Sequence, residues 1–468
     1  MKRNIENLKI ILTVIIMLSL FIQSCSKTDS WLDEKSNLGD VKPTTLVDFQ
    51  AILDNATIMN FGYPGAGLTG GDNYYLIDQN YTSSAQYLRN SYIWAKDIFA
   101  GAASSDWTSA YKIIQCANIV LDGLQSIKKS SANALEYDRV KGSALFFRSY
   151  AYYTLSQTFC GPYTAASIND PGLVLRENSD VGVKSSRATI GETYLRMLED
   201  ISEAIDILSA TSGYQTRPTR SAANGLMAKI QLSMDNYEEA LKYSGDALAE
   251  FKYLLDFNNT NVVSTATTFR FPAYPGNPEI LFYARQPGLT STSASTTTLG
   301  YVDSTLYKSY ENDDLRKTIF YQYTNKTKIQ FRGNYSGTLN NFAGIATNEI
   351  LLIHSECNAR TGKYSDALDD LNLLLSKRYR AGKFVPLNIS DPDLLLMKIL
   401  EERRKELPFT GQLRWEDLRR LNKDQRFAKI LVRIIAGTRY ELLPKSKRYV
   451  FPIPDVELEL SGISQNER

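Results

Sequence analysis

Histidine is almost absent from this chain, because His354 is the only one among 468 residues. A two-histidine metal site or a zinc cluster cannot be built from these residues. A serine–histidine–aspartate triad would have to use His354, which follows Leu351 and Leu352 in a pattern typical of a packed helix. We expect His354 to be a hydrogen-bonded helix residue without a catalytic role.

Cysteine is also scarce, with four residues in the chain: Cys25, Cys116, Cys160 and Cys357. The last three lie far apart in apolar helical patterns. Export of the protein would permit disulfides, but an odd number of cysteines leaves at least one thiol without a partner. We therefore expect buried free thiols at these three positions.

Motifs for phosphate or cofactor binding are missing. The stretch 61–71 holds five glycines, but it lacks the Gly-Lys-Ser/Thr sequence and the strand–loop–helix setting of a phosphate-binding loop. The sequence therefore predicts no cofactor.

Net charge is missing as well. Removal of residues 1–24 would take away three basic and one acidic side chain and leave 50 of each. A neutral chain argues against nucleic-acid binding. Residues 376–450 are a local exception, with 19 Lys and Arg against nine Asp and Glu. We interpret this basic stretch as a solvated or partner-facing surface rather than a phosphate-binding patch.

Long apolar runs are absent except at the N-terminus. Residues 10–22 form an apolar run of 13 residues behind three basic ones. A membrane-spanning helix needs ~20 residues, whereas this run is typical of a signal peptide. It ends in Gln23-Ser24-Cys25, which is similar to a bacterial lipobox. We expect residues 1–24 to be a lipoprotein signal peptide and Cys25 to carry lipid; an ordinary secretory signal is the alternative.

Helical periodicity fills most of the remaining chain. Apolar residues recur every three or four positions over residues 105–127, 136–159 and 189–208. A repeat follows, because Tyr237–Leu241 matches Tyr364–Leu368, and an apolar helix and a short turn precede each copy. This spacing resembles tetratricopeptide repeats. We expect scattered helix pairs that stack for stability.

The pattern changes between residues 257 and 341, where helical periodicity fades and small polar residues dominate. Within it, Thr318–Tyr323 and Lys328–Phe331 predict a β-hairpin. We expect residues 25–42 to be a tether and 43–468 to be one domain. Its helical scaffold would cover about 43–256 and 342–435, and the irregular insert about 257–341.

The most regular stretch runs from Asp391 to Leu421. Asp391 favours a helix start, and leucines spaced by four and seven residues mark one apolar face. Arg403 falls on this face, where an unpaired charge would be costly to bury. We therefore predict structural roles for Arg403, Arg414 and Trp415, with Arg403 in an ion-pair cluster with nearby carboxylates: Glu401, Glu402, Glu406 and Asp417. Paired catalytic carboxylates are the alternative.

The same stretch resembles the C-terminal signature of the SusD/RagB family of nutrient-uptake lipoproteins, E-R-x-x-E-L-x-F-x-G-x-R-W-x-D-L-x-R. The matching residues are Glu402, Arg403, Glu406, Leu407, Phe409, Gly411, Arg414, Trp415, Asp417, Leu418 and Arg420. Gln412 and Leu413 stand where the signature has a single residue. Phe451–Pro454 resembles the family's closing F-P-I-P motif.

The resemblance implies a mostly α fold of tetratricopeptide-like helix pairs, an α–α superhelix, with an irregular loop-rich insert containing short β-hairpins. It implies an outer-membrane lipoprotein on the cell exterior, attached to the membrane through its lipid anchor only. Such a protein captures oligosaccharide and delivers it to a partner SusC-like TonB-dependent transporter. It implies no catalysis, and we expect no nucleic-acid partner.

Two non-helical segments offer residues suited to a glycan. Aromatic rings can cover the C–H faces of a sugar, and polar side chains can bond its hydroxyls. The candidate ligand-binding residues are Asp72, Asn73, Tyr74, Tyr75 and Trp94 in the first segment, and Tyr283, Arg285 and Tyr301 in the insert. The resemblance implies ligand contacts in loops of these two regions. Trp94 fits a core position equally well.

Two other functions stay open on the residues alone. A surface glycoside hydrolase needs only two carboxylates, and the chain has many, although no local motif marks a pair. A tetratricopeptide-type scaffold that binds only proteins would show the same helix pattern.

Overall fold

The computed structural model describes residues 43–287, 299–324 and 327–468. The predicted signal peptide, the anchor Cys25 and the tether lie outside these residues. The chain divides into two compact units, Met1–Asp48 and Phe49–Arg468. Helix α3 (Leu46–Leu53) spans the boundary, and all later elements belong to the second unit. None of the helices in the described residues has both the length and the apolar character needed to cross a membrane.

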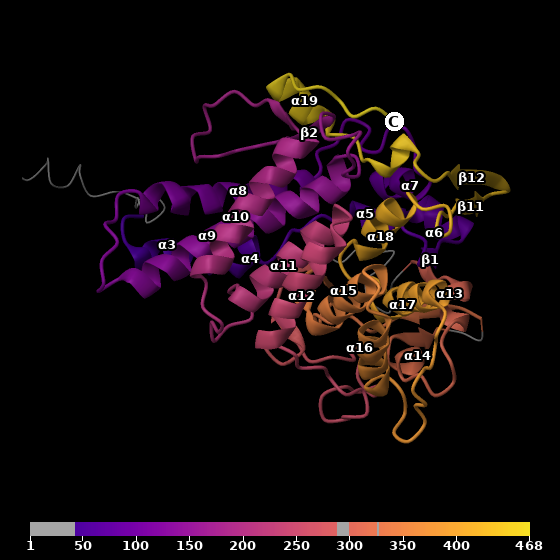
Figure 1. Ribbon diagram of the computed structural model, residues 1–468. Helices are drawn as coiled ribbons and strands as arrows, with labels where there is room; N and C mark the ends of the chain where they lie inside the picture. The colour runs from indigo at the N-terminus through magenta and orange to yellow at the C-terminus, as the bar shows by residue number, and fades with distance from the viewer. Residues whose placement is uncertain (1–42, 288–298, 325–326) are drawn as a thin grey trace, which may run out of the picture. The chain divides into compact units, whose positions relative to one another are not determined.

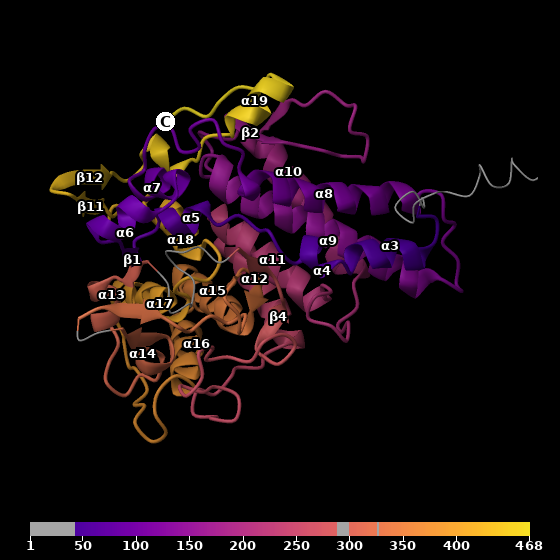
Figure 2. The same cartoon turned by 180° about the vertical axis from the view of Figure 1, so that it is seen from behind.

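Helices that pack side by side form the scaffold of the second unit (Figures 1 and 2). They are α8 (Ser105–Leu124), α9 (Ala134–Phe159), α10 (Ile190–Ile207), α11 (Arg220–Ser233), α12 (Tyr237–Glu250), α15 (Thr347–Arg360) and α16 (Tyr364–Ser376). Each packs against the next, and α12 packs directly against α15 although the insert lies between them in sequence. The scattered pairs that we expected are therefore one continuous stack, because the chain leaves it after α12 and returns at α15.

Local sequence signals start several of these helices. Thr189 accepts a hydrogen bond from the Glu192 amide, and the Glu192 carboxylate accepts one from the Thr189 amide at 2.7 Å, which is a complete capping box. The Asp391 carboxylate likewise accepts from the Leu394 amide at 2.9 Å and starts α17 (Pro392–Glu406), as predicted. The repeated tyrosines Tyr237 and Tyr364 are the first residues of α12 and α16.

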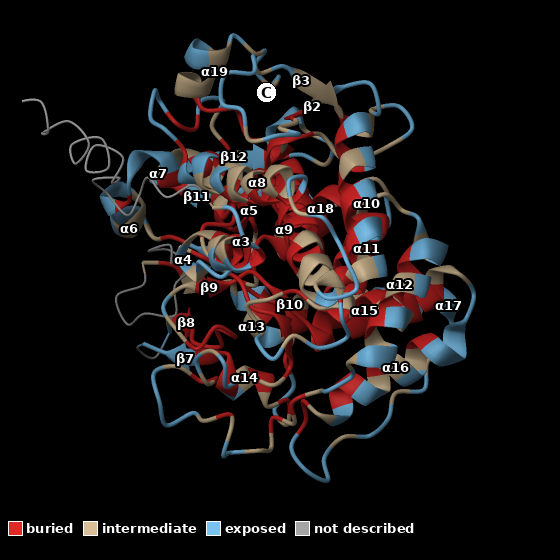
Figure 3. Ribbon diagram, turned by 90° about the vertical axis from the view of Figure 1, so that its left-hand side faces the viewer, coloured by how far each residue is buried: buried red, intermediate tan, exposed pale blue. Residues whose placement is uncertain are grey.

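Helix α9 lies at the centre of the stack, and every residue from Gly142 to Phe159 is buried (Figure 3). Its Arg148 is paired with Asp200 of α10, with two contacts of 2.7 Å. The same guanidinium donates to the Asn118 side chain of α8 at 2.8 Å. One buried arginine therefore fixes three consecutive helices relative to one another.

The single histidine and the cysteines behave largely as expected. His354 Nδ1 lies 2.7 Å from Asp370 Oδ2, which confirms a hydrogen-bonded helix residue. Cys116, Cys160 and Cys357 are free thiols; the last two are buried, whereas Cys116 is half-buried. The described residues contain no cluster of His, Cys, Asp and Glu that could hold a metal ion.

The insert is built from short antiparallel ladders. Strand β4 (Ile280–Phe282) pairs with β10 (Ile345–Ala346), and β5 (Arg285–Gln286) pairs with β9 (Asn341–Phe342). The predicted hairpin is confirmed as β7 (Tyr321–Tyr323) and β8 (Ile329–Phe331). It is shorter than predicted, because α14 (Arg316–Ile319) takes up the preceding residues.

The scaffold ends earlier than the predicted boundary at residue 435. Helix α18 (Leu413–Leu421) is followed by an antiparallel hairpin of β11 (Leu431–Ile435) and β12 (Thr438–Leu442). Side chains of β11 alternate strictly between buried and exposed positions. This period of two is that of a strand with one solvated face, so the helical interpretation of these residues was wrong.

The glycine-rich stretch serves close packing. Gly67 and Gly70 belong to α5 (Ala66–Gly70), which lies against Trp415 of α18. A Cβ atom would come within 2.9 Å of the indole at Gly67 and within 2.7 Å at Gly70. Only glycine allows this approach, and Trp415 is fully buried as a result. The predicted structural role of Trp415 is confirmed.

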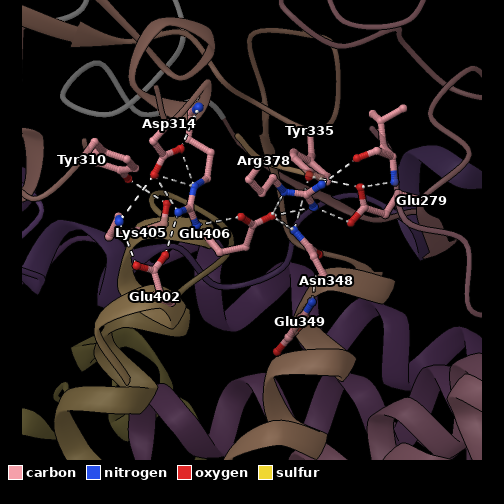
Figure 4. Close-up of polar contacts among 12 residues, drawn as sticks. Glu279, Tyr310, Asp314, Tyr335, Asn348, Glu349, Arg378, Glu402, Lys405 and Glu406 are labelled. Carbon is pink, nitrogen blue, oxygen red and sulfur yellow. Dashed lines mark hydrogen bonds and ion pairs between the residues drawn. The ribbon is translucent and has the colours of Figure 1, made fainter. Parts of the chain in front are cut away.

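A buried network of charges joins the insert to the scaffold (Figure 4). Arg316 of the insert donates to Asp314, to Glu402 at 2.6 Å and to Glu406 at 3.2 Å, and all four side chains are fully buried. Lys405 donates to Glu402 at 2.8 Å. Burial alone would raise the pKa of Glu402, but the surrounding cations lower it to about 2.

The second half of this network centres on Arg378. Its guanidinium donates to Glu406 and to Glu279 of the insert, each at 2.9 Å, and to the Leu255 carbonyl at 2.6 Å. Tyr335 lies 3.3 Å from Glu279 in the same cluster (Figure 4). Glu402 and Glu406 are both part of the C-terminal signature. Between them they bind Arg316 from the insert and Arg378 from the scaffold, where these two parts of the protein meet.

Arg403 has the structural role predicted for it, with Asp417 as the one predicted partner that it contacts and Glu349 as a partner that was not predicted. Its Nε lies 3.0 Å from both Asp417 oxygens, and its Nη2 lies 3.8 Å from Glu349. Glu402 and Glu406 point to the other arginines instead. The predicted cluster is therefore two adjacent ion-pair networks on two faces of α17.

The Arg378 network predicts a large loss of stability when its cation is removed. Arg378→Met leaves Glu279 and Glu406 without their shared partner, which should lower the free energy of unfolding by ~3–5 kcal/mol. The measurement is urea unfolding followed by circular dichroism. Arg380→Met is the matched control, because Arg380 pairs with Asp313 at 3.3 Å on the surface and should cost less than ~1 kcal/mol. Equal losses in both variants would contradict the role of Arg378.

Glu279 predicts a specific dependence of stability on pH. Burial raises the pKa of Glu279 to about 7; Arg378 opposes the rise and Glu406 adds to it. The folded state then holds the Glu279 proton more tightly than the unfolded state. The contribution of Glu279 to the free energy of unfolding is therefore full below about pH 4.5 and falls as pH rises to about 7. Glu279→Gln should flatten the fall in unfolding free energy between pH 5 and pH 7.5. Parallel curves for variant and wild type would refute this.

Candidate functional site

The structure brings together the two segments that the sequence marked for ligand binding. Strand β1 (Tyr74–Tyr75) pairs antiparallel with β6 (Tyr301–Val302) of the insert, and Tyr75 lies opposite Tyr301. The two rings are 5.7 Å apart at an angle of 46°. Tyr75 is 38% exposed and Tyr301 is half-buried. Directly opposed residues share one face of a ladder, so both rings belong to the same surface.

A second pair of tyrosines extends this surface. Tyr307 of α13 (Ser304–Lys308) and Tyr323 of β7 have ring centroids 5.6 Å apart, and Tyr323 is 52% exposed. Lys328, just before β8, places its ammonium 4.8 Å from the Tyr301 ring, and β6 packs against β8. We call Tyr75, Tyr301, Tyr307 and Tyr323 the tyrosine face.

The hydroxyls of Tyr75 and Tyr307 stay protonated near neutral pH. Burial raises the pKa of Tyr75, and the neighbouring Tyr301 adds to the rise. Burial and the hydrogen bond with Tyr323 raise the pKa of Tyr307 to about 12. A neutral phenol both donates and accepts hydrogen bonds, which suits a ligand rich in hydroxyls.

Asp72 and Asn73 lie behind this surface and anchor it to the scaffold. Asp72 accepts from Arg414 at 2.6 and 3.0 Å and from Lys429 at 2.7 Å. Asn73 accepts from Arg404 at 3.0 Å. Burial alone would raise the pKa of Asp72, but Arg414, Arg404 and Lys429 hold it well below its usual value. The predicted structural role of Arg414 is confirmed, and both polar side chains already have protein partners.

Tyr74 and Trp94, the other two predicted residues of the first segment, belong to the core. Tyr74 is buried, and its hydroxyl donates to the Thr69 carbonyl at 2.9 Å. Trp94 is only 1% exposed, its Nε1 donates to the Gly70 carbonyl at 3.0 Å, and the Arg433 guanidinium lies 4.7 Å from its ring. Neither ring has a face open to a ligand in this structure.

Tyr283 and Arg285 lie in a different part of the insert. Tyr283 is buried and its ring packs 5.1 Å from that of Tyr274. Arg285 lies in β5 with its guanidinium 5.0 Å from the Phe61 ring and 5.9 Å from the Tyr283 ring. Strand β5 pairs with β9 and not with β6, so these residues do not share the tyrosine face.

Tyr307 and Tyr323 were not among the residues predicted from the sequence. The only signal for them is the number of tyrosines between residues 301 and 323 of the insert. Nearby carboxylates are engaged: Asp303 caps α13 by accepting from the Leu306 amide at 2.9 Å, and both Asp303 and Asp72 lie 3.5 Å from Arg404. The arrangement therefore offers aromatic stacking and neutral hydrogen bonding rather than a pair of free carboxylates.

Comparison with known sequences identifies the class of protein. Residues 30–232 match a family model described as starch-binding and associating with the outer membrane, and residues 257–467 match the model of the SusD family. The chain belongs to the SusD family, which confirms the resemblance of its C-terminal signature. No curated protein matches the chain.

Several solved structures share the fold. One is a SusD superfamily protein from Bacteroides thetaiotaomicron, with 19% identity and a TM-score of 0.71 over 91% of this chain and 100% of that chain. Another is a SusD-like carbohydrate-binding protein from Bacteroides vulgatus, with 19% identity and a TM-score of 0.67 over 90% and 97%. A SusD superfamily protein from Bacteroides fragilis has 21% identity and a TM-score of 0.71 over 90% and 99%. These likenesses confirm the mostly α fold.

The burial of Trp94 and the exposure of Tyr75 predict opposite effects on stability. Trp94→Ala should lower the free energy of unfolding by ~3–5 kcal/mol, because it empties a core position. Tyr75→Ala should cost less than ~1 kcal/mol, because the side chain is partly solvated. Urea unfolding of both variants checks this. A Trp94→Ala protein as stable as wild type would place the indole outside the core.

Proposed function

We propose that this protein is a cell-surface lipoprotein that captures oligosaccharide on the tyrosine face and delivers it to a SusC-like TonB-dependent transporter. The observation that carries the proposal is the Tyr75–Tyr301 pair. Two segments more than 200 positions apart in sequence meet there and present rings on one surface. Buried anchors at Asp72 and Asn73 hold the first segment in place, so the rings are ordered before ligand arrives.

The chemistry of the face fits a neutral saccharide. Phenol rings cover C–H patches, and their protonated hydroxyls exchange hydrogen bonds with sugar hydroxyls. Lys328 beside Tyr301 adds a donor at the edge of the face. We propose binding without catalysis, since the carboxylates nearest to the face are held by Arg404.

The place of action rests on the N-terminal sequence. We propose that Cys25 carries lipid and holds the protein on the outer membrane, facing the cell exterior. The short apolar run before Cys25 supports cleavage rather than membrane spanning. Family membership supports the outer-membrane location. The transporter partner follows from the resemblance of the chain to its family.

Isothermal titration calorimetry with maltoheptaose, followed by a panel of other neutral oligosaccharides, tests the capture step. Tyr75→Ala and Tyr301→Ala should each weaken binding by ~0.5–1.5 kcal/mol, a factor of about 2 to 12 in Kd, through loss of a stacking ring. Tyr253→Ala is the matched control, because Tyr253 is a 46% exposed tyrosine after α12, outside the tyrosine face. Unchanged affinity in a folded Tyr75→Ala/Tyr301→Ala protein would refute this site.

Two further experiments distinguish capture from other activities. New reducing ends after incubation with the bound oligosaccharide would indicate hydrolysis and contradict binding without catalysis. Wild-type protein extracted from its membrane without any TonB-dependent transporter attached would contradict the delivery step while leaving the capture step standing.

A further inference from the structure

A cavity with both polar and apolar walls lies far along the chain from the residues of the tyrosine face. It has a volume of about 870 Å³, and its walls come from four segments: 161–171, 419–423, 445–450 and 464–467. Sites for small molecules commonly have ~300–1,000 Å³, which is far more than one inorganic anion fills. Lys445 and Lys447 are exposed, so the cavity reaches the surface. We call it the C-terminal cavity.

The wall formed by the C-terminal segment is held in place by specific hydrogen bonds. The Gln465 side chain exchanges two bonds of 2.8 Å with the backbone of Ile453. The Asn466 amide donates to the carbonyls of Phe159 and Phe451, each at 2.8 Å. Arg187 of β3 (Arg187–Thr189) holds the Ser464 carbonyl at 3.0 Å, and the C-terminus lies beside β2 (Pro171–Val174) and β3 in Figure 3. The cavity is therefore formed without a ligand.

Arg419 is one of the groups on the cavity wall whose hydrogen-bonding capacity the fold does not fully satisfy. It is only 3% exposed, and its two terminal nitrogens donate to the carbonyls of Gln157 and Cys160 at the end of α9. Its Nε is itself buried and has no hydrogen-bond acceptor among the described residues, and no carboxylate among them forms an ion pair with Arg419. Helix carbonyls offset part of the charge, but a buried guanidinium without a carboxylate is costly.

Further cations surround the same space. The charged lining residues are Arg419, Lys423, Lys445 and Lys447 against Asp170 and Glu467. Lys423 is paired with Asp235 and Lys447 with Glu467, whereas Lys445 has no ion-pair partner among the described residues. All four cations belong to the basic stretch 376–450, whose excess the tyrosine face does not explain. Hydroxyls of Thr164, Ser167, Ser446 and Ser464 also line the wall, beside apolar residues such as Pro162, Ile190 and Val450.

We propose that the C-terminal cavity binds an acidic saccharide through its anionic group, a carboxylate or a sulfate ester, with Arg419 and Lys445 as counter-charges. An anion in the cavity would be attracted by the charge of Arg419 in the wall, and the hydroxyls of the wall suit the remaining sugar. The inference is independent of the tyrosine face, which is neutral in character. The chain would then hold two sites, one for neutral and one for acidic saccharide units.

The test uses calorimetry on the whole secreted chain with trigalacturonic acid, a sulfated disaccharide and neutral galactotriose. At least one acidic probe should bind, with an affinity that falls as salt rises, and galactotriose should bind the cavity at least ten times more weakly. Lys445→Glu should weaken the acidic probe about tenfold, because it replaces attraction by repulsion. Lys252→Glu, an exposed charge reversal after α12, is the control and should leave affinity unchanged.

One further variant and one parallel measurement on wild type keep the outcome decisive. The Tyr75→Ala/Tyr301→Ala protein should bind the acidic probe as wild type does; loss of acidic binding there would place the acidic sugar on the tyrosine face and overturn the proposal. Absence of binding by both acidic probes, or equal losses in Lys445→Glu and Lys252→Glu, would also overturn it. Binding of maltoheptaose to wild type, measured in parallel, shows whether the tyrosine-face proposal stands when this one fails.

Discussion

The position of the insert depends on two carboxylates one helical turn apart, Glu402 and Glu406. Apolar packing has no direction, so it would allow the insert several positions on the scaffold. A fully buried carboxylate allows the insert only a few positions, because loss of its arginine partner leaves an unpaired charge in a medium of low dielectric. Glu406 contacts Arg316 and Arg378 at once, and so fixes two chain segments together. We interpret this network as the device that sets Tyr301 of the insert opposite Tyr75.

The sequence predicted features whose causes are local. Asp391 caps its helix because its partner, the Leu394 amide, is three residues away. The apolar face of α17 likewise marked Arg403 as a residue that needs a carboxylate. Asp417 was among the expected partners because it is near in sequence. The other partners were less predictable: Glu349 lies in α15, and Glu406 reaches Arg316, 90 positions earlier. No periodicity encodes such pairs, since they depend on how distant segments meet.

The candidate site shows the same limit. Tyr75 and Tyr301 stood out because polar and aromatic residues gather in non-helical segments, but their pairing across β1 and β6 is a tertiary event. The same criterion also selected Trp94, which is buried because Arg433 and the Gly70 carbonyl satisfy its ring and its N–H. Composition cannot distinguish an aromatic ring that faces solvent from one that a distant arginine covers.

Because α12 packs directly against α15, the insert is a long connection between two neighbouring helices of the scaffold. The two ends of the insert lie close together whatever the conformation of its middle. Lengthening such a connection costs little free energy, about 0.6 kcal/mol for each doubling of its length. Strands at its periphery, such as β6 and β7, can therefore vary in length and sequence while the packing of the scaffold helices stays the same. Only the residues that reach Glu402 and Glu406 are bound to remain. The fold thus separates the part that can diversify from the part that must stay constant.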